Sequence, residues 1–320
     1  MKIFFIGQNP DRGLKDSDPT SLKSMALKMG HSIASNLGDN PDVVICVDWD
    51  KASAKHVKRA EILRIPTVLV KNEPSVVAPG HSDARIDSKF GAIVEVGRPN
   101  YSPLIRWPQT WNLEHFGNKQ RIDRAVAISA NKFSFVSGEL YSLRARVYST
   151  SDSLDLFGVG WDRSVINNAL KLARELQIAV LGRANKITLA CLASFRFEPM
   201  NFLGQAEDKL EVLSRYKVSV VIENSNEYMS EKLIDSILAG TIPVYVGPPV
   251  EMFGIPPEMV VFANPNPQDV TRAITQAGLM SYGDWHEMAA RWLAVPETSE
   301  IWSAQTVMSQ ILNIARSIIE

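Results

Sequence analysis

The chain has 320 residues, of which 45% are hydrophobic and 22% are charged, so it can bury a sizeable core and is not disordered by composition. Lys and Arg number 34 and Asp and Glu number 35, which gives a formal charge of -1. That balance argues against a nucleic-acid-binding protein with a dominating basic field. At about 150 residues per domain, the length predicts two domains.

The sequence shows no pattern typical of a signal peptide, a membrane-spanning helix, a disulfide framework or a zinc site. No apolar run approaches the ~18 residues that a membrane-spanning helix needs, and the one at the N-terminus is too short for a signal peptide. We therefore expect a cytoplasmic protein with at most peripheral membrane contact. The two cysteines, Cys46 and Cys191, are isolated. They predict buried small side chains rather than a disulfide or a zinc site.

The first hundred residues alternate between short apolar runs and amphipathic segments. The apolar runs predict buried strands at residues 3–6, 43–47, 66–70 and 92–96. The amphipathic segments predict helices over residues 21–37 and 52–63. Buried strands that alternate with helices indicate a parallel sheet covered on both faces. The segment 97–117, rich in proline and aromatic residues, marks the end of this domain.

The second half repeats the alternation. Strands are predicted at residues 133–136, 218–222, 242–246 and 259–262. Helices are predicted at residues 140–148, 230–238, 267–276, 284–293 and 298–319. We therefore divide the chain into an N-terminal domain of residues 1–117, a second domain of residues 118–300, and a C-terminal helix of residues 301–320. This last helix is expected to pack back on the first domain.

The segment 216–249 carries the densest chemistry. Its first strand ends at Ile222, the polar residues Glu223 and Asn224 follow, and a helix is expected from Ser230, a good N-cap residue. Lys232 falls in the first helical turn, where the helix dipole disfavours a positive charge. A lysine there is understandable if it and the backbone N–H groups both face a phosphate. The alternative is an ordinary strand–loop–helix unit with solvated charges.

Several residue types of this segment recur in order in one known family. They are Tyr216 and Lys217, the run from Glu223 to Ser225, Tyr228, the run from Ser230 to Leu233, the run from Ala239 to Val244, and the run from Gly247 to Pro249. The segment resembles the α-1,3/4-fucosyltransferases of glycosyltransferase family 10, here of the soluble microbial type. The similarity is weaker over residues 132–162 and only suggestive in the first domain.

The resemblance implies a fold and a donor site. The fold is α/β of the GT-B type, with two Rossmann-like doubly wound domains facing a cleft, and the second domain holds a GDP-sugar. Lys232 would bind the diphosphate and Glu231 the ribose hydroxyls, while Asn224 and Tyr228 would contact the donor. The loop between these last two is shorter than in bacterial members of the family.

An arginine and a carboxylate complete the implied site. The family places an arginine on donor phosphate at the position of Arg144; the nearby Arg146 is the competitor, since two residues two apart on a helix point in different directions. The family's base is a glutamate after a strand of the first domain, and Glu73, which follows the strand at 66–70, is the candidate. Glu95 is the second choice. A solvated loop acid is the alternative interpretation of Glu73.

Two further motifs receive weaker functional interpretations. Asp48 and Asp50 form an Asp-x-Asp pair after a strand, as in metal-dependent transferases, but they lie in the domain that the resemblance assigns to the acceptor. We expect a strand-end loop, no metal site and no cofactor besides the donor. The five histidines are scattered and are expected to be structural or exposed.

The sequence therefore predicts an inverting, metal-independent transferase that moves fucose from GDP-fucose to a hydroxyl of an oligosaccharide or polysaccharide. One alternative is a GT-B transferase that uses another nucleotide sugar. The other is a two-domain protein that captures a ligand without chemistry. No nucleic-acid partner is expected.

Overall fold

The computed structural model describes residues 1–7, 22–117, 120–132, 134, 136–161 and 199–319. The chain divides into two compact units. Unit 1 comprises Met1–Trp111, Glu227–Glu231 and Ala294–Glu320, and unit 2 comprises Asn112–Asn226 and Lys232–Leu293. Unit 1 is therefore made of three separate segments of the chain, and the second of them, Glu227–Glu231, lies inside the segment with the family resemblance.

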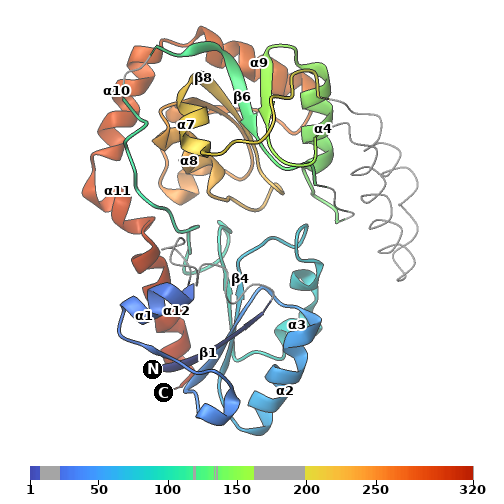
Figure 1. The fold of residues 1–320 in the computed structure, drawn as a ribbon, viewed down its shortest axis with the longest axis vertical. Coiled ribbons are helices and arrows are strands. Elements are labelled where there is room, and N and C mark those ends of the chain that lie inside the picture. Colours follow the sequence, from blue (N-terminus) through green and yellow to red (C-terminus); the bar gives the residue numbers. More distant parts are fainter. Residues whose placement is uncertain (8–21, 118–119, 133, 135, 162–198, 320) are drawn as a thin grey trace, which may run out of the picture. The chain divides into compact units, whose positions relative to one another are not determined.

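Unit 1 is built on a parallel sheet of five strands in the order β2-β1-β3-β4-β5 (Figure 1). The strands are β1 (Lys2–Gly7), β2 (Ser32–Ile33), β3 (Val43–Val47), β4 (Thr67–Lys71) and β5 (Ala92–Glu95). Alternate residues of β3 belong to different cores. Val43, Ile45 and Val47 belong to one cluster, and Val44 and Cys46 to the other. A fully apolar strand is thus what a sheet covered on both faces requires.

Helices cover both faces of this sheet. The helices of unit 1 are α1 (Leu22–Lys28), α2 (Ala54–Ile62), α3 (Ala84–Asp87), α11 (Pro296–Ile301) and α12 (Ala304–Ser317), with single turns η1 (Leu37–Asp39), η2 (Lys51–Ser53) and η3 (Pro79–Ser82). Helices α1 and α12 contribute to the core on one face of the sheet, and α2 to the core on the other. The buried side of α12 joins the same core as Ile3 and Ile45, and α12 packs beside α1 (Figure 1). The C-terminal helix is therefore part of the unit that begins at the N-terminus.

Unit 2 has a second parallel sheet, in the order β10-β9-β8-β6-β7. Its strands are β6 (Ile122–Ile128), β7 (Leu154–Phe157), β8 (Tyr216–Ile222), β9 (Ile242–Val246) and β10 (Val261–Phe262). Its helices are α4 (Tyr141–Thr150), α7 (Lys209–Ser214), α8 (Lys232–Leu238), α9 (Pro267–Leu279) and α10 (Tyr282–Leu293), with turns η6 (Val250–Phe253) and η7 (Pro257–Met259). The doubly wound α/β class is thus confirmed in both units.

Three predicted elements are wrong in extent or place. The helix expected over 21–37 ends at Lys28, because Gly30 turns the chain with a φ of +80° before β2. The helix expected over 298–319 is two helices, separated at Ser303, which caps α12. The first strand of unit 2 is β6, which begins eleven residues before the expected strand at 133–136; positions 133 and 135 lie outside the described residues.

The structure bears on the predictions for the two cysteines and for membrane-spanning helices. Cys46 is fully buried, and Cys191 lies outside the described residues. Burial raises the pKa of the Cys46 thiol to about 12, so it is a packed side chain and not a nucleophile. Among the described helices, none combines the length and the apolar character needed to cross a bilayer.

Candidate functional site

The chain order of unit 2 creates a crevice between β6 and β8. These strands are neighbours in the sheet although β7 separates them in sequence, since β7 lies on the other side of β6. The strand order therefore reverses between β6 and β8. Ligands of open α/β sheets bind at such a switch point, beyond the carboxyl ends of the strands.

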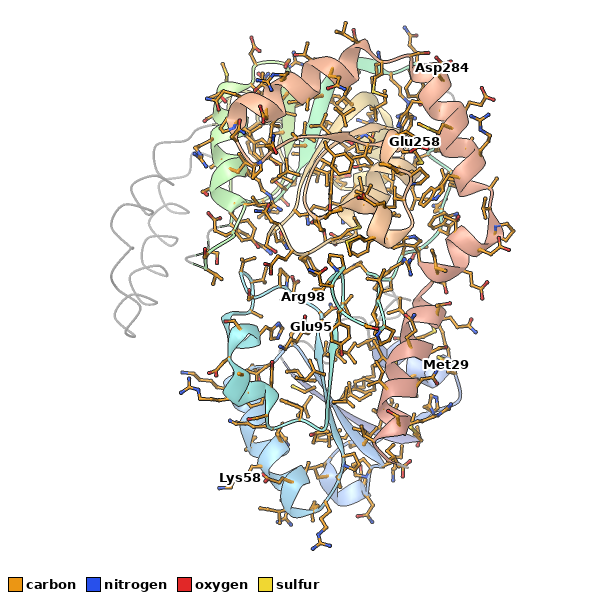
Figure 2. All side chains as sticks on the ribbon, turned by 180° about the vertical axis from the view of Figure 1, so that it is seen from behind. Met29, Lys58, Glu95, Arg98, Glu258 and Asp284 are labelled. Atoms are coloured by element: carbon orange, nitrogen blue, oxygen red, sulfur yellow. The ribbon has the colours of Figure 1, made fainter. Side chains whose placement is uncertain are left out.

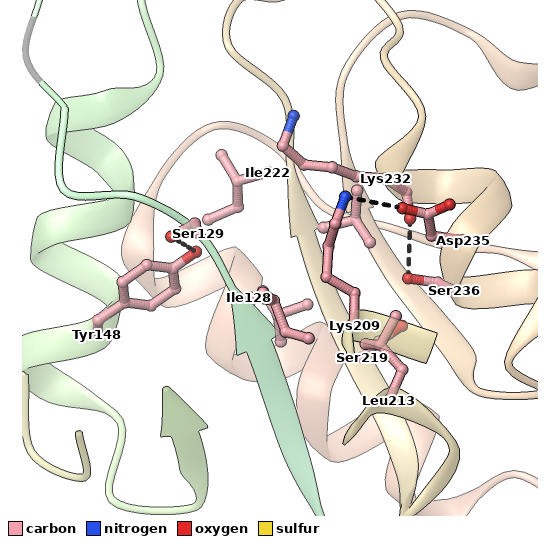
Figure 3. A pocket seen from close by; sticks show the side chains of 12 residues that line it. Ile128, Ser129, Tyr148, Lys209, Leu213, Ser219, Ile222, Lys232, Asp235 and Ser236 are labelled. Atoms are coloured by element: carbon pink, nitrogen blue, oxygen red, sulfur yellow. Dashed lines mark hydrogen bonds and ion pairs between the residues drawn. The ribbon is translucent and has the colours of Figure 1, made fainter. Parts of the chain in front are cut away.

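A pocket lies at this switch point (Figure 3). Its empty space, including the part open to solvent, is about 380 Å³. It is lined by Ile128 and Ser129 at the end of β6, residues 219–222 of β8, Tyr148 of α4, Lys209 and Leu213 of α7, and Lys232, Asp235 and Ser236 of α8. Its walls are largely apolar, and Lys209, Lys232 and Asp235 supply the charged groups.

Lys232 is the lysine that the sequence predicts, and it stands at the start of α8. Its Nζ lies 3.5 Å from Oε2 of Glu223, which directly follows β8. Glu223 is fully buried, whereas the Lys232 side chain is 23% exposed. Burial and the Glu223 charge hold the pKa of the neighbouring Tyr245 phenol well above its ordinary range. Because Glu223 directly follows β8, its ion pair with Lys232 places the Lys232 ammonium at the carboxyl end of that strand.

Arg144 and Asn224 are hydrogen-bonded to each other at the carboxyl end of β8. Arg144 is only 2% exposed, and its Nε and Nη2 donate to the Ile222 carbonyl at 3.0 and 2.5 Å. Nη2 also donates to Asn224 Oδ1 at 2.9 Å, and the guanidinium stacks on Tyr141. Arg144 thus anchors the end of β8, and its contact with a donor phosphate stays a prediction. Its competitor Arg146 is exposed, as their spacing requires.

Tyr228 and Glu231 belong to unit 1, unlike the other predicted donor residues. Tyr228 is 1% exposed, its hydroxyl donates to the Asn72 carbonyl at 2.9 Å, and its ring meets Trp107 edge-on. The Glu231 carbonyl accepts from Gln109 Nε2 at 3.1 Å. Tyr228 therefore holds the segment Glu227–Glu231 beside the loop after β4. A donor contact by either side chain stays a prediction.

Glu73, the predicted base, follows β4 at the carboxyl edge of the unit 1 sheet. Its backbone N–H donates to Asp48 Oδ1 at 2.8 Å, and its carbonyl accepts from His81 Nδ1 at 2.7 Å. Asp48 also accepts from the Asn72 N–H at 2.8 Å. Side chains from two other segments thus hold the main chain at the candidate base.

Glu95, the second choice for the base, is engaged in ion pairs within unit 1. Its Oε1 lies 3.2 Å from Lys71 Nζ and its Oε2 lies 3.2 Å from Arg98 Nε; Figure 2 labels Glu95 and Arg98. Lys71 is buried and pairs with Asp87 as well, at 2.8 Å. Both carboxylate oxygens of Glu95 are therefore engaged by cations within unit 1.

The two carboxylates of the Asp-x-Asp pair hold two different loops, Asp48 the loop after β4 and Asp50 the loop after β3. Asp48, with a φ of +52°, accepts the two N–H groups already described. Asp50 caps η2 by accepting from the Ser53 N–H at 2.8 Å and from the Ser53 hydroxyl at 2.5 Å. Within the described ranges, no group of three or more His, Cys, Asp or Glu residues has the arrangement of a metal site.

Other lining residues of the pocket escaped the sequence analysis. Lys209 and Asp235 come from different helices and pair at 3.5 Å, and the Ser129 hydroxyl donates to the Tyr148 hydroxyl at 3.3 Å. Asp235 stands three residues after Lys232, on the neighbouring turn of α8, and this spacing was the available signal. Ser129 gave none, because the strand before it was placed too late in the chain.

No family model matches the chain. A putative fucosyltransferase-like protein of Arabidopsis thaliana is 54% identical over 44 residues, which are 13% of this chain and 9% of that protein.

Solved structures match over nearly the whole chain at low identity. HepE of Anabaena in complex with UDP has a TM-score of 0.56 at 14% identity, with 99% of this chain and 100% of that chain covered. A UDP-forming α,α-trehalose-phosphate synthase of Burkholderia xenovorans has a TM-score of 0.54 at 10% identity, with 88% of this chain and 75% of that chain covered. A mutant of the O-GlcNAc transferase of Thermobaculum terrenum has a TM-score of 0.52 at 12% identity, with 100% of this chain and 67% of that chain covered. The chain therefore has the GT-B fold of these glycosyltransferases.

Proposed function

We propose that the protein is a glycosyltransferase that moves fucose from GDP-fucose to a hydroxyl of a glycan acceptor. The observation that carries the proposal is the pocket at the switch point of unit 2 with Lys232 on its wall, in a chain with the GT-B fold. The Arabidopsis match and the motif resemblance to fucosyltransferases support fucose as the sugar.

The reaction needs a base and a stabilised leaving group. Glu73 removes the proton from the acceptor hydroxyl while the hydroxyl oxygen attacks the anomeric carbon of the donor sugar. The bond from that carbon to the diphosphate breaks on the opposite face, so configuration inverts. The leaving GDP gains negative charge, which the Lys232 ammonium offsets. Glu231 binds the ribose, and Asn224 and Arg144 contact the donor at the end of β8. Tyr228 contacts the donor and keeps the segment Glu227–Glu231 in place.

A second candidate is a transferase with a UDP-sugar. The observation that favours it is that two of the structural neighbours contain or form UDP. The two candidates differ only in the nucleotide, and direct binding measurements separate them.

The experiment is a calorimetric titration with GDP, UDP, CMP and TDP, followed by hydrolysis and transfer assays with the corresponding sugars. We expect GDP to bind most tightly. Lys232→Ala should weaken GDP binding by about 1.5–3 kcal/mol, tenfold or more. Lys217→Ala is the matched control, because its ammonium donates to the Gly278 carbonyl and does not line the pocket. Preference for UDP would select the second candidate, and no binding of any nucleotide would refute both.

A further inference from the structure

A network of hydrogen bonds fixes the main chain on both sides of the Glu73 side chain. The Glu73 N–H donates to Asp48 Oδ1 at 2.8 Å, and the Glu73 carbonyl accepts from His81 Nδ1 at 2.7 Å. Both backbone polar groups of this residue are thus bound by side chains rather than by a neighbouring strand. We call Asp48 and His81, with these bonds, the Glu73 clamp.

The clamp is itself anchored. The second ring nitrogen of His81, Nε2, accepts from the Trp49 N–H at 3.2 Å, one residue beyond Asp48. The His81 carbonyl accepts from Lys71 Nζ at 2.9 Å, so the loop from residue 73 to 81 is tied at both ends to the carboxyl edge of the sheet. His81 and Asp48 are 3% and 4% exposed. Buried bonds of this kind are costly to break, because each leaves an unsatisfied group.

The bonds determine the protonation state of His81. Nε2 faces a donor and must carry the lone pair, while Nδ1 faces a carbonyl and must carry the proton. The imidazole is therefore neutral. Burial, with smaller contributions from Lys71 and Arg98, holds its pKa below the ordinary value of 6.5, and the Glu73 carbonyl and Asp87 oppose this shift. Asp48 Oδ1 lies 3.7 Å from Nε2.

We propose that His81 is a positioning residue of the transfer reaction, which acts with Asp48 by holding the Glu73 main chain so that the carboxylate is aimed at the acceptor hydroxyl. The inference rests on the proposed function, because Glu73 has a proton to remove only in a transferase. With the main chain fixed on both sides, the Cα–Cβ bond of Glu73 has a defined position and direction. An error of about 1 Å in the place of a catalytic group can cost about 100-fold in rate.

A kinetic double-mutant cycle tests this role. His81→Phe keeps a ring and removes both bonds, and we expect kcat to fall about 10- to 100-fold with an unchanged KM for the donor. Glu73→Gln should lower kcat about 10²- to 10⁴-fold. If His81 acts through Glu73, the double variant is no slower than Glu73→Gln alone. A merely structural role would lower the rate by the same factor in both backgrounds.

Three controls make the outcome decisive. His56→Phe changes another partly buried histidine, which packs edge-on against Phe4, and should leave kcat unchanged. His81→Asn retains a donor near the Nδ1 position and should recover part of the rate; it also replaces His81→Phe in the cycle if that variant does not fold. GDP binding should be equal in all variants.

Each result has one meaning. An additive cycle, or an unchanged kcat in His81→Phe, overturns the role of His81 while the active wild type still supports the transferase. A wild-type protein that acts on no nucleotide sugar overturns the proposed function, and the role of His81 with it.

Discussion

The carboxylate of Glu223 and the ammonium of Lys232 form an asymmetric ion pair, with 3.5 Å between Oε2 and Nζ. Glu223 is completely buried at the end of β8, while Lys232 at the start of α8 keeps contact with solvent. A buried charge without its partner is strongly destabilising, whereas an exposed one is rehydrated. The lysine that is predicted to bind the donor is therefore also the counter-ion of a buried acid.

The first prediction follows from this asymmetry. Lys232→Met strands the buried Glu223 charge and should lower the free energy of unfolding by about 3 kcal/mol. Glu223→Gln leaves a lysine that can turn to water and should cost about 1 kcal/mol. The double variant should recover most of the loss, as measured by urea unfolding. Equal costs for the two single variants, or strict additivity, would contradict the pairing.

The second prediction concerns Arg144. Arg144→Met removes the donors that satisfy the Ile222 carbonyl and Asn224, so it should destabilise the protein by about 2–4 kcal/mol. Arg146→Met, two residues later on an exposed face of α4, is the matched control and should change stability by less than about 0.5 kcal/mol. Denaturant unfolding measures both. Similar values for the two variants would mean that the buried guanidinium does not anchor β8.

The third prediction is a pH dependence from His81. Because its pKa is lower in the folded state than the ordinary 6.5, the unfolded chain takes up the proton first. The contribution to stability is complete above pH 6.5 and is lost as the pH falls from 6.5 toward the folded pKa. Unfolding free energies between about pH 7.5 and about pH 5.5 should therefore fall less steeply in His81→Phe than in the wild type.

Other histidines contribute to the same slope and provide its control. Burial also lowers the pKa values of His31 and His56, though both are much less buried than His81. His56→Phe should accordingly reduce the slope less than His81→Phe does. Parallel curves for the wild type and His81→Phe would show that His81 is not held neutral in the folded protein.

The fourth prediction concerns metal dependence. Asp48 accepts from backbone N–H groups of the loop after β4, Asp50 accepts from one in its own loop, and both carboxylates are part of the fold. Transfer should therefore persist in excess EDTA, measured as GDP release with and without added Mg²⁺. Complete loss of activity in EDTA, restored by Mg²⁺, would return both aspartates to consideration as ligands.

Local patterns in the sequence were sufficient for the class of fold. Val43 to Val47 and Ile242 to Val246 are apolar at every position, which only a sheet covered on both faces accommodates, and the structure confirms both strands. β6 was missed because its first half is polar and partly exposed; Arg124 in it pairs with Asp155 of β7 at 2.7 Å. Burial of only half a strand breaks the apolar run on which such a prediction depends.

The sequence by itself determined the doubly wound class, which depends on short-range periodicity, and its resemblance to a known family supplied the candidate residues Glu73, Arg144 and Lys232. Only the tertiary structure decided which residues accompany them. The neighbours β6 and β8, the partners Asp48 and His81 of Glu73, and the place of Tyr228 in unit 1 all join distant segments. Parallel strands bring together ends that are far apart in sequence, so no local pattern records these contacts.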